Sequence, residues 1–183
     1  MTSTEIQIDF AKPADLPELT EIYNHYVLNT AFTFDTTPFS AADRKTWLTQ
    51  FEPASIHQCL VAKRNNDILG YASSSKLRPK PAYNSSVETT IYLRPDAGGD
   101  GLGSRLYQTL LTNLENLGVH RVYGIVALPN EASMHLHQQH GFVQIGVLNE
   151  VGYKFGQFHD TAWLEKRLEK KLEKKLHQTT ANE

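Results

Sequence analysis

The chain has 183 residues, of which 40% are hydrophobic and 21% are charged, a balance typical of one soluble globular domain. The net charge of −2 creates no strong overall field, so we expect neither nucleic acid nor a membrane as a partner. The single cysteine, Cys59, cannot form an internal disulfide and is predicted to lie in the core among apolar strand residues. Without a signal-peptide pattern or an apolar run of about 18 residues, the sequence predicts a cytoplasmic protein.

Hydrophobic periodicity predicts an alternation of strands and helices. A strand at 5–10 precedes a helix, for which Asp15 is the expected N-cap and Pro17 lies in the first turn. Ser40 and Asp43 resemble a capping box for a short second helix. The remaining elements are strands at 57–64, 68–75 and 86–94, a helix at 104–118, a strand at 121–128, a short helix at 130–141, and strands at 142–148 and 158–168. This order predicts a mixed sheet with helices on both faces.

The C-terminal segment repeats leucine at every fourth position among charged side chains, from about Leu164 to His177. A step of four drifts around a helix of about 3.6 residues per turn, and most of its i,i+4 charge pairs are of like sign. We therefore expect a domain over residues 1–166, followed by a charged helical or frayed tail over residues 167–183.

A glycine-rich stretch, PDAGGDGLGSRL at residues 95–106, directly precedes a predicted helix. Glycines let backbone N–H groups approach a ligand, and a helix N-terminus favours an anion. A dinucleotide fingerprint does not fit, because Ser104 or Leu106 falls where its third glycine belongs. A P-loop does not fit either, because Ser104 and Arg105 replace its lysine and hydroxyl residue. On the glycines alone, a flexible loop without a ligand remains an open alternative.

Four further stretches extend the pattern: YNHYVLNTAFTFDTTP, RPKPAYNSSVE, LPNEASMHLHQQHGF and EVGYKFGQFHD. Together with the glycine loop they resemble the GNAT superfamily of N-acetyltransferases, and within it the phosphinothricin N-acetyltransferase branch, over about residues 5–166. The resemblance implies a GNAT fold, a mixed and mostly antiparallel sheet of about seven strands. It also implies acetyl-CoA as cosubstrate, a small amino-acid-like amine as acceptor, and a homodimer.

In the resembled family the glycine loop holds the pyrophosphate of coenzyme A and reads Q/R-x-x-G-x-G/A. Gly101 and Gly103 match this pattern, whereas Gly98 occupies the Gln or Arg position and Asp100 stands where a base is usual. We expect backbone N–H groups to hold the pyrophosphate, with weaker affinity than in relatives that carry a base. The resemblance implies these coenzyme-binding residues: Ile91, Tyr92, Leu93, Gly99, Asp100, Gly101, Leu102, Gly103, Ser104, Asn130 and Ser133.

Acetyl transfer needs a base for the amine, a donor for the thioester carbonyl and a proton for the leaving thiolate. By resemblance, Glu88 is the candidate base, the backbone N–H of Leu93 the carbonyl donor, and His137 the acid for the thiolate. A solvated carboxylate at position 88 and a packed histidine at position 137 remain the alternatives. Three histidines, His135, His137 and His140, cannot converge from one helix, so we expect no metal.

The acceptor is expected to carry a carboxylate, because Arg78 matches an arginine of the branch and guanidinium binds carboxylates bidentately. Phe34 and Tyr83 are assigned to the same pocket by resemblance. Two alternatives stay open: the same chemistry on a polyamine or a protein N-terminus, and a non-catalytic sensor of acyl-CoA.

Overall fold

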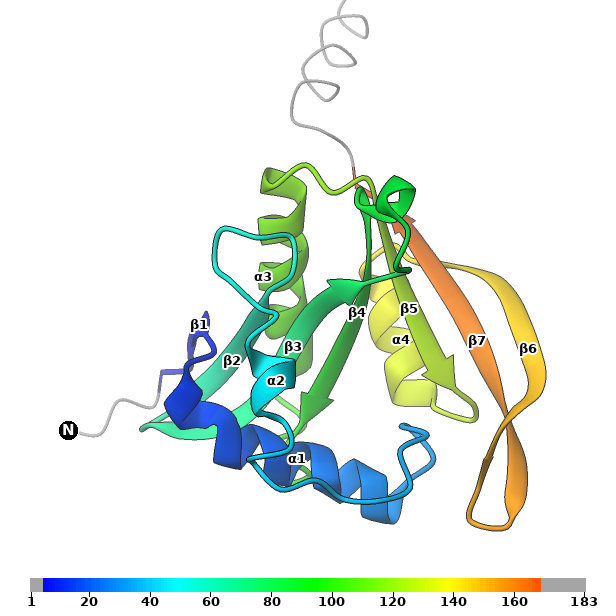
Figure 1. The fold of residues 1–183 in the computed structure, drawn as a ribbon, viewed down its shortest axis with the longest axis horizontal. Coiled ribbons are helices and arrows are strands. Elements are labelled where there is room, and N and C mark those ends of the chain that lie inside the picture. The colour runs from blue at the N-terminus through cyan, green and yellow to red at the C-terminus, as the bar shows by residue number, and fades with distance from the viewer. Residues whose placement is uncertain (1–4, 169–183) are drawn as a thin grey trace, which may run out of the picture.

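The computed structural model describes residues 5–168 of the chain. Its elements are β1 Gln7–Phe10, α1 Leu16–Asn29, α2 Lys45–Leu48, β2 Cys59–Arg64, β3 Asp67–Lys76, β4 Ser86–Leu93, α3 Leu102–Asn116, β5 Arg121–Ala127, α4 Glu131–Gln139, β6 Val143–Lys154 and β7 Gln157–Arg167. Two 3-10 turns, η1 Pro13–Asp15 and η2 Pro81–Tyr83, complete the set. The strands form one seven-stranded sheet in the order β1-β2-β3-β4-β5-β7-β6 (Figure 1). Only β4 and β5 pair in parallel, so the predicted fold class is confirmed.

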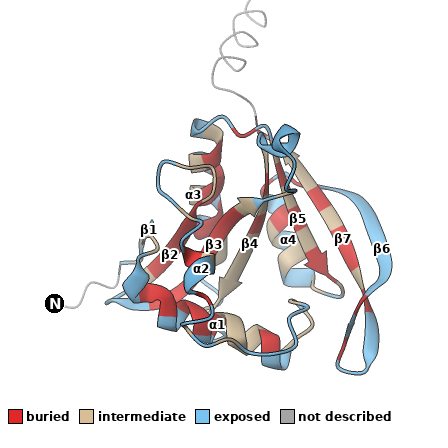
Figure 2. Cartoon of the chain, in the orientation of Figure 1, coloured by how far each residue is buried: buried red, intermediate tan, exposed pale blue. Residues whose placement is uncertain are grey.

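Two apolar clusters hold the helices on opposite faces of the sheet. On one face α3 contributes leucines at helical spacing, such as Leu106, Leu110 and Leu114, which are fully buried against β2–β5 and β7. Each such side chain contributes roughly 1.5–3 kcal/mol by leaving water. On the other face α1 and α2 pack against β2 and β3, and Cys59 lies in this cluster as predicted. Figure 2 shows the contrast with β6, which is exposed along most of its length.

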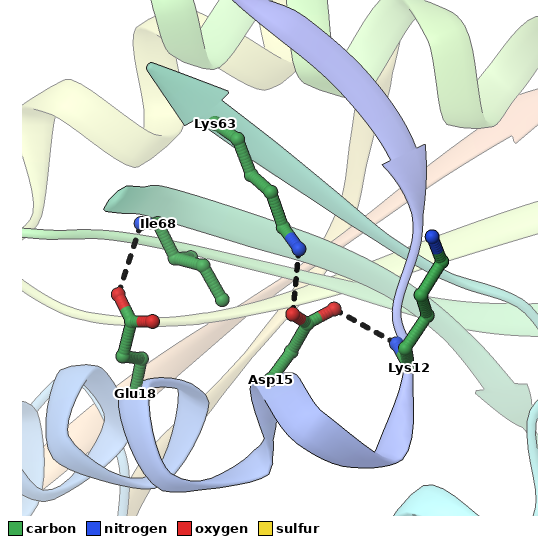
Figure 3. Close-up of polar contacts among 5 residues, drawn as sticks. All are labelled: Lys12, Asp15, Glu18, Lys63 and Ile68. Carbon is green, nitrogen blue, oxygen red and sulfur yellow. Dashed lines mark hydrogen bonds and ion pairs between the residues drawn. The ribbon is translucent and has the colours of Figure 1, made fainter. Parts of the chain in front are cut away.

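Carboxylates fasten the start of α1 to the sheet (Figure 3). Asp15 is the N-cap residue of α1, as predicted, although its side chain makes no capping hydrogen bond to the helix. Its side chain instead accepts a hydrogen bond from the backbone N–H of Lys12 at 2.8 Å and pairs with the Lys63 ammonium. Glu18, one turn later, accepts from the backbone N–H of Ile68 at 3.0 Å. Asp15 ends η1, and its carboxylate lies beside Lys63 of β2, so it pairs with that ammonium rather than with the N–H groups of α1.

The predicted capping box forms, since Ser40 and Asp43 each accept a hydrogen bond from the other's backbone N–H. It closes a turn over residues 41–44, and α2 begins only at Lys45. The strand predicted at 142–148 extends to Lys154, because a bulge between Leu148 and Gly152 absorbs the turn-like residues in between.

The strand predicted at 158–168 is confirmed as β7, so the leucine repeat does not begin a helix at Leu164. Leu164 lies in β7, paired with Gly124 of β5, and is fully buried in the α3 cluster. Arg167 ends β7, and Leu168 is also buried. A leucine at every fourth position fits one face of a strand as well as a helix, and pairing with β5 selects the strand. The leucines at 172 and 176 lie outside the described residues.

Candidate active site

The parallel strands β4 and β5 are paired only at the beginning of their shared length. The pairing covers Ser86–Glu88 and Arg121–Tyr123, and beyond it the strands diverge (Figure 1). A cleft of about 280 Å³ lies there. Its lining comprises residues 89–93 of β4, 125–127 of β5, the beginning of α4, and Tyr26, Phe32 and Gly103. A crevice at the carboxyl ends of strands that separate is a common ligand site in open sheets.

The β3–β4 ladder decides where the N–H groups of β4 point. The N–H of Arg94 donates to the Leu69 carbonyl at 2.8 Å, in register with the ladder, so Arg94 faces β3. Residues that face the partner alternate with residues that face away. Leu93 and Ile91 therefore direct their N–H groups toward the cleft. Tyr26 donates its hydroxyl to the Leu93 carbonyl at 2.7 Å, which holds this end of the strand.

The glycine loop has the backbone form that an anion cradle needs. Gly99 and Gly101 have φ values of +120° and +69°, a region that side chains with a Cβ rarely adopt. The N–H groups of the first helical residues, 102–104, have no acceptor within α3. A Cβ at Gly103 would lie 3.3 Å from the Leu93 side chain, so glycine keeps the loop against the strand end. These donors and the helix dipole fit a pyrophosphate.

Two features of the loop bear on its missing cation. Asp96 forms an ion pair with Arg94 at 2.6 Å, so its negative charge near the loop is partly neutralised. A Cβ at Gly98 would meet no atom within 4 Å, and the φ of this residue lies outside the left-handed region. The backbone therefore does not require glycine at this position, and a larger residue fits without strain.

Glu88 is the last residue of β4 paired with β5, so it lies where the cleft begins. The side chain is half-buried, and burial raises the pKa of its carboxyl while the nearby charge of Arg78 opposes that rise. Loss of solvent disfavours the charged form, and a carboxylate with a raised pKa is a better base. The position and the direction of the shift both suit proton abstraction.

His137 is buried on α4, and its imidazole packs against Gly124 of β5. Its Nδ1 lies 2.8 Å from the Ser133 carbonyl, which can only accept, so Nδ1 carries the proton. The Nε2 atom is buried and has no hydrogen-bond partner within residues 5–168. Burial lowers the pKa of the imidazole, so at neutral pH the ring is uncharged and Nε2 presents a lone pair.

Asn130 caps the start of α4. The Asn130 side chain accepts from the N–H of Ser133 at 3.1 Å, and both residues also line the cleft. Ser104, at the start of α3, places its hydroxyl 2.9 Å from Nε2 of His140, whose Nδ1 lies 3.1 Å from the Gln108 amide oxygen. The side chain of Ser104 is thus held by the protein itself.

The three residues assigned to the acceptor pocket lie outside the lining of the cleft. Arg78 is exposed, with its guanidinium 5.4 Å from the ring centre of Trp163. Tyr83 is exposed on η2. Phe34 packs on Gly152 of β6, where a Cβ would lie 2.3 Å from the ring. Arg78 is brought near Glu88, whereas Phe34 belongs to the contact between the α1–α2 connection and β6.

Sequence reasoning missed the aromatic residues Tyr26 and Phe32, which line the cleft. It also missed Lys154, which contacts the connection between α1 and α2 at Thr33. The Lys154 ammonium, although its residue is buried, donates to the Thr33 carbonyl at 2.8 Å. A signal existed, because all of these residues fall in the quoted stretches YNHYVLNTAFTFDTTP and EVGYKFGQFHD. Their spacing alone does not reveal that the two stretches meet.

Within residues 5–168, no group of three or more His, Cys, Asp and Glu side chains is arranged to hold a metal ion. The helices of that range are also too short or too polar to cross a membrane.

Comparison with known proteins adds a family to this geometry. Residues 8–163 match the model of the acetyltransferase (GNAT) domain. This chain belongs to the GNAT acetyltransferase family. It is 46% identical to a phosphinothricin N-acetyltransferase of Streptomyces coelicolor, over 91% of this chain and 98% of that protein. It is 33% identical to an L-methionine sulfoximine/L-methionine sulfone acetyltransferase of Pseudomonas paraeruginosa, over 85% and 90% of the two chains.

A solved GNAT structure shows the same fold. It is a phosphinothricin acetyltransferase from Sinorhizobium meliloti in complex with acetyl-CoA, with a TM-score of 0.84 and 32% identity, covering 89% of this chain and 88% of that one. The predicted GNAT resemblance and the predicted acyltransferase class are confirmed, and acetyl-CoA is the ligand of that neighbour.

Proposed function

We propose that this GNAT protein transfers the acetyl group of acetyl-CoA to the amine of a small amino-acid-like acceptor, of the phosphinothricin or methionine sulfoximine and sulfone type. The observation that carries the proposal is the cleft that opens directly after Glu88, with outward N–H groups of Leu93 and Ile91 along one wall. The names of the relatives support the class of acceptor.

In the proposed reaction the pyrophosphate of acetyl-CoA lies on backbone N–H groups within residues 99–104, other than that of Gly101, which donates to the Gly99 carbonyl. The thioester arm follows β4 past Ile91, Tyr92 and Leu93. The beginning of α4, with Asn130 and Ser133, contacts the arm from the other wall. Asp100 takes part through its backbone. Placing both reactants in one cleft accounts for much of the rate gain.

Glu88 removes a proton from the ammonium of the acceptor, directly or through water, and the free amine attacks the thioester carbonyl. The Leu93 N–H donates to the carbonyl oxygen as negative charge develops there. The carbon–sulfur bond then breaks, and the thiolate takes a proton. His137 supplies that proton only from its charged form, because neutral His137 carries its single proton on Nδ1.

Acceptor recognition is assigned to Arg78, Tyr83 and Phe34. The cation of Arg78 beside Glu88 favours an acceptor whose carboxylate and amine share one carbon. The same cation repels a polyamine, which makes that alternative less suitable.

A homodimer is proposed to form through β6. This edge strand exposes Val143, Ile145, Val147 and Val151, an apolar surface of the kind that partners cover. Acetyl-CoA is a metabolite of the cytoplasm, and the lone cysteine suits that reducing compartment, so we place the protein there. Sedimentation of the wild type and of Ile145→Lys tests the dimer, with a monomeric variant expected.

The function is tested by release of free thiol from acetyl-CoA with phosphinothricin, methionine sulfone, ordinary amino acids and polyamines. Turnover with the first two, lost in Glu88→Gln, is the expected result. Coenzyme binding without turnover of any amine would favour the acyl-CoA sensor instead.

A further inference from the structure

The orphan donor of the sheet is the indole of Trp163. Its Nε1 is buried and has no hydrogen-bond partner among the described residues. A buried N–H without an acceptor loses its hydrogen bonds to water and gains none, so native proteins rarely keep one without a reason. Trp163 lies on β7, paired with Ile125 of β5 and Gly146 of β6.

Register places this indole on the same face of the sheet as Glu88. Side chains at paired positions point to the same side, and Glu88 pairs with Tyr123. Ile125 lies two residues further along β5, so it shares that face, and its partner Trp163 does too. The neighbouring residue Leu164 points the opposite way, into the α3 cluster.

Arg78 supplies the charge beside the indole. Its guanidinium lies over the Trp163 ring at 5.4 Å, a cation–π arrangement that holds an exposed side chain in place. The one hydrogen bond of its guanidinium in the described structure goes to its own neighbour, the Leu77 carbonyl. Most of the five donors of Arg78 therefore remain for a ligand. The same cation interacts electrostatically with Glu88.

We propose that Trp163 is an acceptor-binding residue: it seats Arg78 and donates its indole N–H to the carboxylate of the acceptor. The inference deepens the proposed function and rests on it. A neighbouring cation and a free N–H together select an anionic oxygen, and Glu88 nearby receives the amine. An α-amino acid carries its amine and carboxylate on one carbon, so it reaches both groups at once.

Trp163→Phe removes the donor and keeps an aromatic ring under Arg78. We expect kcat/KM for methionine sulfone to fall about tenfold, through KM, as for loss of one hydrogen bond to a charged group. The KM for acetyl-CoA stays unchanged. For the decarboxylated analogue, 3-(methylsulfonyl)propylamine, the variant and the wild type are expected to be equal. Equal losses on both amines, or no loss on either, would overturn the inference.

The chain offers a matched control, because its second tryptophan, Trp47, also lies under an arginine. Arg44 stands 3.9 Å above that ring, within the cluster under α1 and α2. Trp47→Phe should leave the KM for methionine sulfone unchanged.

Trp47→Phe also leaves Trp163 as the single tryptophan, which allows a test without turnover. With coenzyme A bound, addition of methionine sulfone should change the fluorescence of Trp163, whereas addition of the decarboxylated amine should not. An emission that responds to neither compound contradicts the role of Trp163. Failure of the proposed function shows separately, as absence of thiol release by the wild type.

Discussion

The two halves of the site are built differently. The proposed coenzyme half is made of backbone: the outward N–H groups of β4, the glycine loop, and the first turn of α3. The proposed acceptor half is made of side chains on connections and strand surfaces, such as Arg78, Tyr83 and Phe34. A backbone cradle follows from the fold and tolerates change in sequence, whereas a side-chain pocket can be altered one residue at a time. This division explains how one fold can keep its cosubstrate while its acceptor varies.

The largest expected effect is at the junction of the two halves. Glu88→Gln should lower kcat by roughly 100-fold or more, because the base is lost, with little change in the affinity for acetyl-CoA. Since the base works ionised and burial raises the pKa of Glu88, wild-type kcat/KM should rise with pH through that raised pKa. The variant should lack this limb in a pH–rate profile.

Glu165→Gln is the matched control, because Glu165 lies on the same face of the sheet but pairs with Arg121 at 3.2 Å. Comparable losses of kcat in the two variants would contradict the proposal that Glu88 is the base.

On the coenzyme half, His137→Gln should lower kcat by about tenfold, less than the change at position 88, because a thiolate is a good leaving group and neutral Nε2 has no proton to give. Steady-state kinetics measure this, with His135→Gln, an exposed position of the same helix, as control. A loss as large as that of Glu88→Gln would contradict the modest role.

On the acceptor half, Gly152→Ala should displace the Phe34 ring, because the new Cβ would lie 2.3 Å from it. We expect the KM for the acceptor to rise several-fold, about 1 kcal/mol for a disturbed packing contact, with the KM for acetyl-CoA unchanged. Gly146→Ala, on the same strand with open space around its Cβ, is the control. If both variants behave as wild type, Phe34 has no part in acceptor binding.

The smallest effect is expected at Gly98. Gly98→Arg fits without strain and adds a cation beside the proposed pyrophosphate, so the Kd of coenzyme A should fall a few-fold, and less so at high salt. Isothermal titration measures the change, and Gly98→Ala separates charge from backbone stiffness. No tightening with arginine would contradict the view that this loop lacks a useful cation.

The sequence by itself determined the order of elements, the fold class and the family. These features are local, because hydrophobic periodicity and contiguous motifs involve residues close together in the chain. Glu88 could be named because its motif is contiguous with Arg78 along the chain.

Only the tertiary structure decided what depends on partners far apart in the chain. The sequence predicts the strand that holds Leu164, but the place of that strand between β5 and β6 depends on distant partners that a local pattern cannot reveal. The Asp15 carboxylate does not bond the first N–H groups of α1, because it pairs with Lys63 of β2 instead. Trp163 meets Arg78 only because the sheet brings β7 under the β3–β4 connection, and pairing across such sequence distances is set by the packing of the whole sheet.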